Sequence, residues 1–220
     1  MGGSIGFESR RYIMQKKTKS SLLKLTQAAI LIALIFLLGF TPIGFLRVGA
    51  IEITFLVIPV AVGAVILGPA YGALLGAIFG IVSLIQCFTG SPFGSALLSV
   101  SAVSTVMLCI VPRTLMGLLS ALIFKGMRRA TKNDYVSCGV ASVSAALLNT
   151  LFFMLTLVLL FGSSDYIQNM MQSFNASNFI TFALAFVGIN GAIEAAACAL
   201  IGFGISSVII RFLPKDTAPE

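Results

Sequence analysis

The chain has 220 residues, of which 58% are hydrophobic and 10% are charged, with a net charge of +7 and a mean hydropathy of +1.06. A soluble domain has about 25% charged residues, so this composition excludes a water-soluble fold and indicates a multi-pass membrane protein. Each transmembrane helix needs about 20 residues, so the length suits one bundle of about six helices and leaves no room for a second domain.

The basic residues gather beside apolar segments. Of the 14 Lys and Arg residues, all except Arg47 and Arg113 lie before or at the start of the first apolar segment, in a predicted loop at residues 125–132, or at or after the end of the last segment. The positive-inside rule then places both termini in the cytoplasm. Nucleic-acid binding is a poor interpretation, because these clusters contain no interleaved aromatic residues.

The domain boundaries follow from the same pattern. Residues 1–19 form a basic tail, residues 20–213 the six-helix membrane domain, and residues 214–220 a short C-terminal tail. The opening MGGSIGF is compatible with an expression scar ahead of a native Met14, and we leave it out of the fold prediction.

The first predicted span is Leu22–Phe45, and its AILIA segment places Ala29 and Ala33 four residues apart. Small residues at this spacing let helices approach closely. The spacing is equally compatible with packing inside the bundle and with a docking face for another membrane helix.

A glycine- and proline-containing loop follows at residues 41–53, TPIGFLRVGAIEI. It is too apolar for a solvated loop, so we expect it to fold back over the bundle as a lid that includes Pro42 and Gly44. The alternative is a short surface turn in which Arg47 pairs with Glu52.

The second and third predicted spans are short and rich in small residues. Thr54–Leu67 runs inward, Gly68 and Pro69 make a turn, and Ala70–Phe88 runs outward with glycines at strict four-residue spacing at positions 72, 76 and 80. This ridge favours close helix packing over a role in substrate binding.

The remaining segments complete the predicted six spans. Residues 89–104 are rich in serine and glycine and are expected to be an outer loop or an interrupted helix. The fourth span ends at Lys125, the fifth is Tyr135–Phe161, the polar residues 162–178 form an outer loop, and the sixth span is Phe179–Phe212.

Four polar residues lie well inside these apolar spans: Arg113, Asn149, Asn190 and Glu194. A charged side chain at the centre of a bilayer costs about 2.5–3.5 kcal/mol, so such residues face the protein interior or a water-filled cavity. One interpretation is a structural network in which Arg113 pairs with Glu194 and the asparagines bridge helices. The other is a cavity, open to the outside, that binds a small polar molecule.

Conventional catalysis finds little support in the sequence. There is no histidine, no Walker loop and no acid cluster, and the four cysteines are scattered through apolar spans without a CxxC pair. We therefore expect no enzyme activity, metal or cofactor. A stand-alone proton-coupled transporter using Glu194 stays open, although no inverted repeat is visible.

Several motifs together resemble the substrate-binding S components of energy-coupling factor (ECF) vitamin transporters. They are AILIA, FTPIGF, IPVAVGAVILGPAYGALLGAIFG, SPFG, PRTLMG, LLNT and NGAIE, and the resemblance runs from about residue 19 to residue 215. It implies a six-helix subunit in a prokaryotic cell membrane that captures a water-soluble vitamin at the outer face. Transport then requires a membrane T component and two cytosolic ATPases.

The resemblance also implies residue roles. Ala29 and Ala33 match the partner-docking motif, and the loop from Pro42 through Gly44 and Phe45 to Glu52 matches the gating loop. The outer halves of the last three spans match the vitamin pocket, which here contains Arg113, Asn149, Asn190 and Glu194.

The favoured vitamin is pantothenate, with folate, pyridoxine and riboflavin as alternatives. Arg113 or Arg47 offers a partner for a carboxylate, and the asparagines and Glu194 suit amides and hydroxyls, all of which pantothenate carries. Folate calls for a larger, more aromatic pocket, and the chain has no tryptophan.

Overall fold

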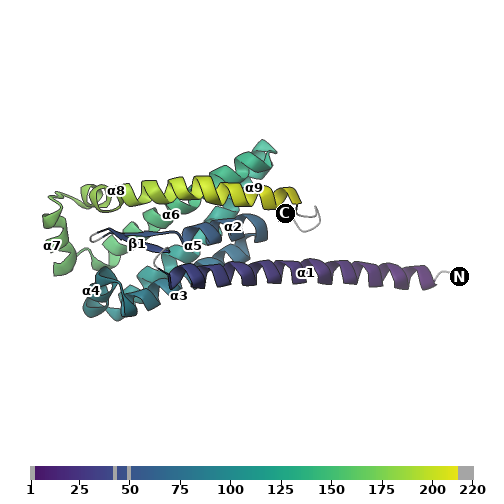
Figure 1. The fold of residues 1–220 in the computed structure, drawn as a ribbon, viewed down its shortest axis with the longest axis horizontal. Coiled ribbons are helices and arrows are strands. Elements are labelled where there is room, and N and C mark those ends of the chain that lie inside the picture. The colour runs from purple at the N-terminus through teal and green to yellow at the C-terminus, as the bar shows by residue number, and fades with distance from the viewer. Residues whose placement is uncertain (1–2, 42–43, 49–50, 213–220) are drawn as a thin grey trace.

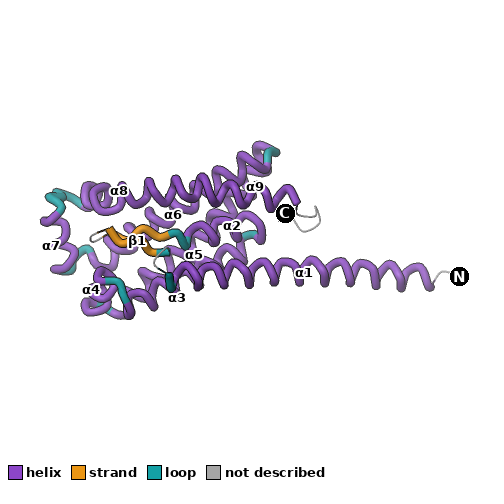
Figure 2. The backbone as a smooth tube through the Cα atoms, in the orientation of Figure 1, coloured by secondary structure: helices purple, strands orange, loops and turns teal. Residues whose placement is uncertain are grey.

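The computed structural model describes the backbone of residues 3–41, 44–48 and 51–212, and side chains at residues 21–41, 44, 54–186, 188 and 191–212. The chain is mostly helical, as predicted, and forms an elongated bundle (Figure 1, Figure 2). Its elements are α1 (Gly3–Gly39), β1 (Phe45–Val48), β2 (Ile51–Thr54), α2 (Val57–Leu67), α3 (Pro69–Thr89), α4 (Pro92–Val100), α5 (Ala102–Thr131), α6 (Asp134–Phe161), α7 (Asp165–Ser173), α8 (Phe179–Ala197), a π-helical segment (Cys198–Gly202) and α9 (Phe203–Phe212).

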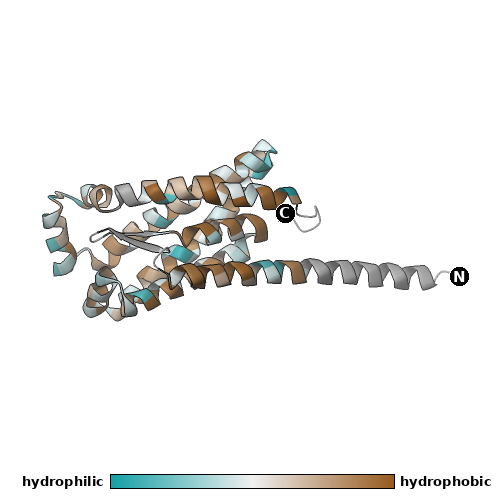
Figure 3. Ribbon diagram, in the orientation of Figure 1, coloured by the Kyte–Doolittle hydropathy of each residue, from teal (hydrophilic) through white to brown (hydrophobic). Residues whose placement is uncertain are grey.

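Among the described residues, five helical segments are long and apolar enough to cross a membrane, and α2 is a shorter apolar helix beside them. The five segments are Ser21–Gly39, Pro69–Thr89, Ala102–Thr131, Asp134–Phe161 and Gly191–Phe212. Large apolar side chains such as Leu159 and Leu200 are more than 70% exposed, which suits contact with lipid rather than water. Figure 3 shows hydrophobic residues along α1, α2 and α9.

Helix α2 lies at the centre of the bundle, because all eleven of its residues are buried. A helix that is apolar on every side needs neighbours all round. Eleven residues at 1.5 Å each span about 16 Å, which is too short to cross a bilayer core of about 30 Å. The prediction that Thr54 opens the second span is wrong: Thr54 ends β2, and the helix starts at Val57.

The predicted lid is a two-stranded antiparallel hairpin rather than a loop. Helix α1 ends at Gly39, so Phe45 belongs to β1 and not to the first span. The β-branched residues at positions 51, 53 and 54 favour a strand here. In the register of the hairpin Arg47 is opposite Glu52, and the side chains of both, with that of Phe45, lie outside the described residues. Pro42 lies outside them altogether.

The glycine ridge of α3 packs directly against the backbone of α5, which confirms the packing prediction. A Cβ atom added at Gly76 would lie 2.1 Å from the carbonyl oxygen of Arg113, and one added at Gly80 would lie 2.7 Å from that of Cys109. The third glycine of the ridge, Gly72, meets Gly117 in the same way, at 2.4 Å. The two helices are therefore antiparallel and in backbone contact along three turns.

Polar residues cap short helices inside two of the predicted loop segments. Residues 89–104 hold α4 between α3 and α5, which confirms the expectation of an interrupted helix. The polar loop at residues 162–178 contains a further helix, α7, capped by the Ser164 side chain, which accepts a hydrogen bond from the Ile167 N–H. The side-chain cap makes a short helix possible in a polar segment.

The predicted basic loop at residues 125–132 is mostly helix, since α5 continues to Thr131. Basic side chains are favourable in the last turn of a helix. Arg128 Nε lies 2.8 Å from the Asp134 carboxylate, which links α5 to α6 across the turn.

The described ends of the chain lie at one end of the bundle. The start of α1, the end of α9 and the α5–α6 turn are at this end, and the hairpin, α4 and α7 are at the other (Figure 1). The basic residues of α5 and α9 thus lie together, as the positive-inside pattern requires. The membrane orientation and the six-span count stay predictions.

Replacing Gly76 by alanine tests the backbone contact. Because the new Cβ would collide with the Arg113 carbonyl, we expect Gly76→Ala to lower the free energy of unfolding by about 1–3 kcal/mol. Gly126→Ala is the matched control: nothing lies within 4 Å of its Cβ position, so the variant should gain up to about 1 kcal/mol. Thermal unfolding in detergent measures both. Equal effects would contradict a close α3–α5 contact.

Candidate functional site

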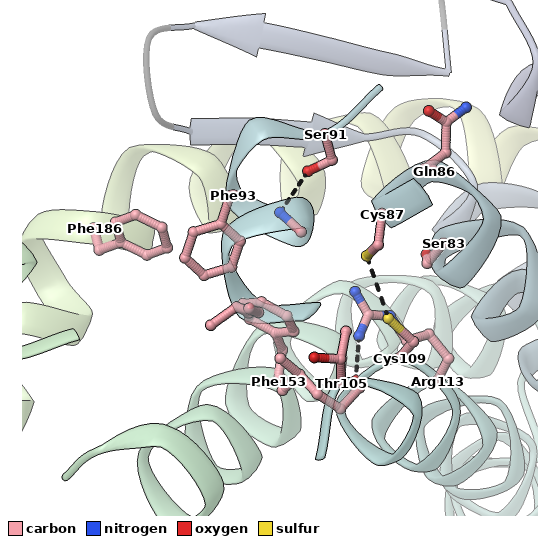
Figure 4. A pocket seen from close by; sticks show the side chains of 13 residues that line it. Ser83, Gln86, Cys87, Ser91, Phe93, Thr105, Cys109, Arg113, Phe153 and Phe186 are labelled. Carbon is pink, nitrogen blue, oxygen red and sulfur yellow. Dashed lines mark hydrogen bonds between the residues drawn. The ribbon is translucent and has the colours of Figure 1, made fainter. Parts of the chain in front are cut away.

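A cavity of about 90 Å³ lies among α3, α4, α5, α6 and α8, at the end of the bundle that carries the hairpin. Its lining combines polar, thiol and aromatic side chains around one guanidinium group (Figure 4). The polar residues are Ser83, Gln86, Ser91, Thr105 and Arg113, the thiols are Cys87 and Cys109, and the aromatic residues are Phe93, Phe153 and Phe186. Gly94, Leu97 and Leu108 complete the wall.

Arg113 is placed in this cavity by the proline that precedes it. Pro112 has no N–H, so the carbonyl of Leu108, four residues earlier, lacks its helical donor. The Arg113 Nη1 donates to that carbonyl at 2.6 Å. The side chain is only 9% exposed. Pro112 thus leaves one helical carbonyl without its backbone donor, and the hydrogen bond from Arg113 to that carbonyl fixes the position of the guanidinium.

Two aromatic rings also contact the Arg113 guanidinium. Its carbon Cζ lies 4.9 Å from the ring centre of Phe153 and 5.5 Å from that of Phe79. Such cation–π contacts stabilise a desolvated cation by about 2 kcal/mol or more. The charge is therefore buried in a site that tolerates it and remains on the cavity wall.

The SPFG segment builds the wall opposite. The Ser91 hydroxyl accepts a hydrogen bond from the Gly94 N–H at 2.9 Å and caps α4, with Pro92 at the first helical position. Phe93 then packs against the rings of Phe153 and Phe186. Gly94 has to be glycine, because an added Cβ would lie 2.5 Å from the Cys87 sulfur.

Glu194 belongs to a second polar centre, separate from the lining of the cavity. It is 5% exposed. One carboxylate oxygen accepts a hydrogen bond from the Thr54 N–H at 3.0 Å, and the other accepts from the Asn149 Nδ2 at 3.3 Å. Thr54 is the last residue of β2, so Glu194 ties the hairpin to α6 and α8. The Asn149 Oδ1 is buried without a hydrogen-bond partner among the described residues.

The predicted site residues are thus only partly brought together. Arg113 lines the cavity, whereas Asn149 and Glu194 bond to each other away from it, and the described side chains include no ion pair within 4 Å between Arg113 and Glu194. The structural interpretation therefore holds for Asn149, which bridges α6 and α8, and not for an Arg113–Glu194 pair. The side chain of Asn190 lies outside the described residues.

The remaining predicted residues lie on α1 and at the base of the hairpin. Ala29 and Ala33 are exposed on the surface of α1, whereas Ala28 beside them is buried. Gly44 is buried, and its carbonyl accepts a hydrogen bond from the Phe55 N–H at 3.0 Å, which closes the base of the hairpin. The two alanines therefore present a face that this bundle does not cover.

Sequence reasoning missed most of the cavity wall, including Gln86, Thr105 and Phe186. Helical spacing offered a signal for part of it. Cys109 is four residues before Arg113, and Phe153 is four residues after Asn149, so each faces the same way as a polar residue that the sequence does single out. The rest comes from α3 and α4, which only the packing of the helices brings near Arg113.

Comparison with known proteins identifies the family of this chain. The family model "ECF transporter, substrate-specific component" matches residues 23–206. The chain therefore belongs to the family of substrate-specific components of ECF transporters, and it is a membrane transport protein.

One curated relative is similar over part of this length. It is the pantothenic acid transporter PanT of Lactococcus lactis subsp. cremoris (strain MG1363), 28% identical over 120 residues. The match covers 50% of this chain and 59% of that protein.

Two substitutions of Glu194 test the second polar centre. Glu194→Leu leaves the Thr54 N–H and the Asn149 amide without an acceptor, and each buried unpaired donor costs about 1–3 kcal/mol. Glu194→Gln keeps one carbonyl oxygen and nearly the same shape. We expect a clearly larger fall in the apparent unfolding temperature in detergent for Glu194→Leu. Indistinguishable falls would show that the two hydrogen bonds contribute nothing.

Proposed function

We propose that this chain captures pantothenate at the outer face of the membrane and delivers it as the S component of an ATP-driven importer. The single observation that carries this proposal is the buried guanidinium of Arg113 on the wall of a polar and aromatic cavity. A buried cation that reaches a cavity is suited to a ligand carboxylate, because the pair forms charge-assisted hydrogen bonds. The pantothenic acid transporter among its relatives favours that vitamin.

The cavity is proposed to open to the outside. It lies at the end of the bundle opposite the basic ends of α5 and α9, which the positive-inside rule assigns to the cytoplasm. The β1–β2 hairpin packs against α8 at this end. A cavity of about 90 Å³ holds a few waters, so it must widen before a vitamin fits. We assign the hairpin the role of the gating loop whose movement provides that space.

Asn149 and Glu194 then act at the junction between ligand and lid. The Asn149 Oδ1 is buried without a partner among the described residues and lies outside the cavity lining, so it would accept from a ligand hydroxyl or amide only once the hairpin moves and the cavity extends to it. Glu194 holds the Thr54 N–H, so movement of the hairpin breaks or remakes that bond. Membership of the family favours this role for Glu194 over that of a proton carrier in a stand-alone transporter.

Transport is proposed to require a T component and two cytosolic ATPases, since the chain has no nucleotide-binding motif of its own. We assign the exposed face of α1 around Ala29 and Ala33 to docking with the T component. Small side chains on a lipid-facing helix suit close contact with a partner helix.

Arg113→Ala is expected to weaken pantothenate binding by about 2–5 kcal/mol, the usual cost of removing one partner of a buried charge pair. Isothermal calorimetry on the purified protein measures this. Arg129→Ala, an exposed arginine at the opposite end, should leave the affinity unchanged. If Arg113→Ala binds as tightly as the parent, Arg113 has a structural role only.

The vitamin is identified by mass spectrometry of ligand that co-purifies with the protein, followed by calorimetry with pantothenate, folate, pyridoxine and riboflavin. Binding of another vitamin in place of pantothenate would retain the S-component role and correct the substrate.

Ala33→Trp is expected to prevent assembly with the T component and ATPases while vitamin binding by the isolated protein stays intact. The bulky ring blocks close helix contact, and position 33 lies outside the cavity lining. Leu159→Trp is the control, because Leu159 is 73% exposed on a different helix, α6. Co-purification with the tagged partner subunits measures assembly. Normal assembly of Ala33→Trp would place the docking face elsewhere.

A further inference from the structure

The wall of the cavity carries two cysteines whose sulfur atoms lie 3.7 Å apart. Cys87 comes from α3 and Cys109 from α5, and all four cysteines of the chain are reduced thiols. Figure 4 shows the two sulfurs facing each other beside the guanidinium of Arg113. Two thiols this close are within reach of oxidation to one disulfide.

We propose that Cys87 and Cys109 form a dithiol modification site that hydrogen peroxide oxidises to a disulfide, and that this disulfide shuts off vitamin binding in the cavity. The effect on binding rests on the proposed function, whereas the disulfide itself does not. The oxidant is a small neutral hydroperoxide, because a cavity of about 90 Å³ admits a molecule of that size.

The reaction balances without another reagent. One thiol loses its proton, its sulfur attacks a peroxide oxygen and the O–O bond breaks, which gives a sulfenic acid and a hydroxide that takes up the released proton as the first water. The second thiol attacks the sulfenic sulfur, the S–S bond forms and the second water leaves. Two thiols and one hydrogen peroxide thus give one disulfide and two waters, with two electrons passing from sulfur to oxygen.

The surroundings favour this pair over the other two cysteines. Thiolates react where a positive charge is near and solvent has access. Arg113 follows Cys109 by one helical turn and shares its cavity. Cys138 and Cys198 instead belong to the main hydrophobic core and do not line the cavity, so they are matched controls within the same chain.

Closing the bond would change the shape of the cavity. A sulfur–sulfur bond is about 2.0 Å long, so the two sulfurs must move toward each other from their present 3.7 Å. Gly94 of α4 sits directly against the Cys87 side chain, so a movement there shifts the SPFG wall. Cys109 is next to Leu108, whose carbonyl accepts the hydrogen bond from the Arg113 guanidinium. A movement of Cys109 therefore affects the position of that guanidinium as well.

Titration of the full-length protein in detergent with hydrogen peroxide tests the site. We expect a product lighter by two hydrogens and a Cys87–Cys109 cross-linked peptide, in the parent and in a Cys138→Ala/Cys198→Ala variant alike. Pantothenate affinity by calorimetry should fall by about tenfold or more and return after reduction with dithiothreitol. In Cys87→Ser and in Cys109→Ser, peroxide should leave the affinity of that variant where it was before treatment.

Each other outcome contradicts a stated part. Absence of the cross-linked peptide at peroxide levels that consume exposed thiols overturns the site. A disulfide that forms without loss of affinity overturns its control of the cavity. If the reduced parent binds none of the four vitamins, the proposed function fails, and the peptide mapping still decides whether the dithiol exists.

Discussion

Three glycines of α3 let its backbone touch the backbone of α5, and the position of Arg113 follows from that contact. The carbonyls of Arg113 and Cys109 lie where side chains at Gly76 and Gly80 would be. This fixes α5 at the turn that Pro112 interrupts, and the Leu108 carbonyl freed by the proline receives the guanidinium. One small-residue ridge thus sets both the packing of the bundle and the charge on the wall of its cavity.

Polar groups inside an apolar bundle need partners, and this requirement divides them into two centres. Arg113 is satisfied by a carbonyl and two aromatic rings, and Glu194 by the Thr54 N–H and the Asn149 amide. Neither charge depends on the other for a contact. The guanidinium therefore lies on the cavity wall, and the carboxylate joins the base of the hairpin to α6 and α8.

The sequence predicted some features of the fold and the site correctly and missed others. The glycine spacing predicted the α3 contact correctly, and the burial of Arg113, Asn149 and Glu194 follows from charge and amide groups within apolar spans. The hairpin was missed because a short apolar stretch with β-branched residues is equally compatible with a lid loop and with the start of a helix. The α7 helix was missed because its stability comes from a cap and from packing of Ile167 and Met171, not from a long apolar period.

The sequence by itself determined the membrane class, the likeness to the S components and which polar residues must be buried. These features depend on composition and local spacing. A charge is costly in lipid wherever it occurs in an apolar span, and small residues at four-residue spacing allow helices to pack closely. Only the tertiary structure decided that Arg113 and Glu194 serve separate centres and that Cys87 meets Cys109. Those outcomes depend on contacts between residues far apart in the chain, and no local pattern specifies which helices meet or at what depth.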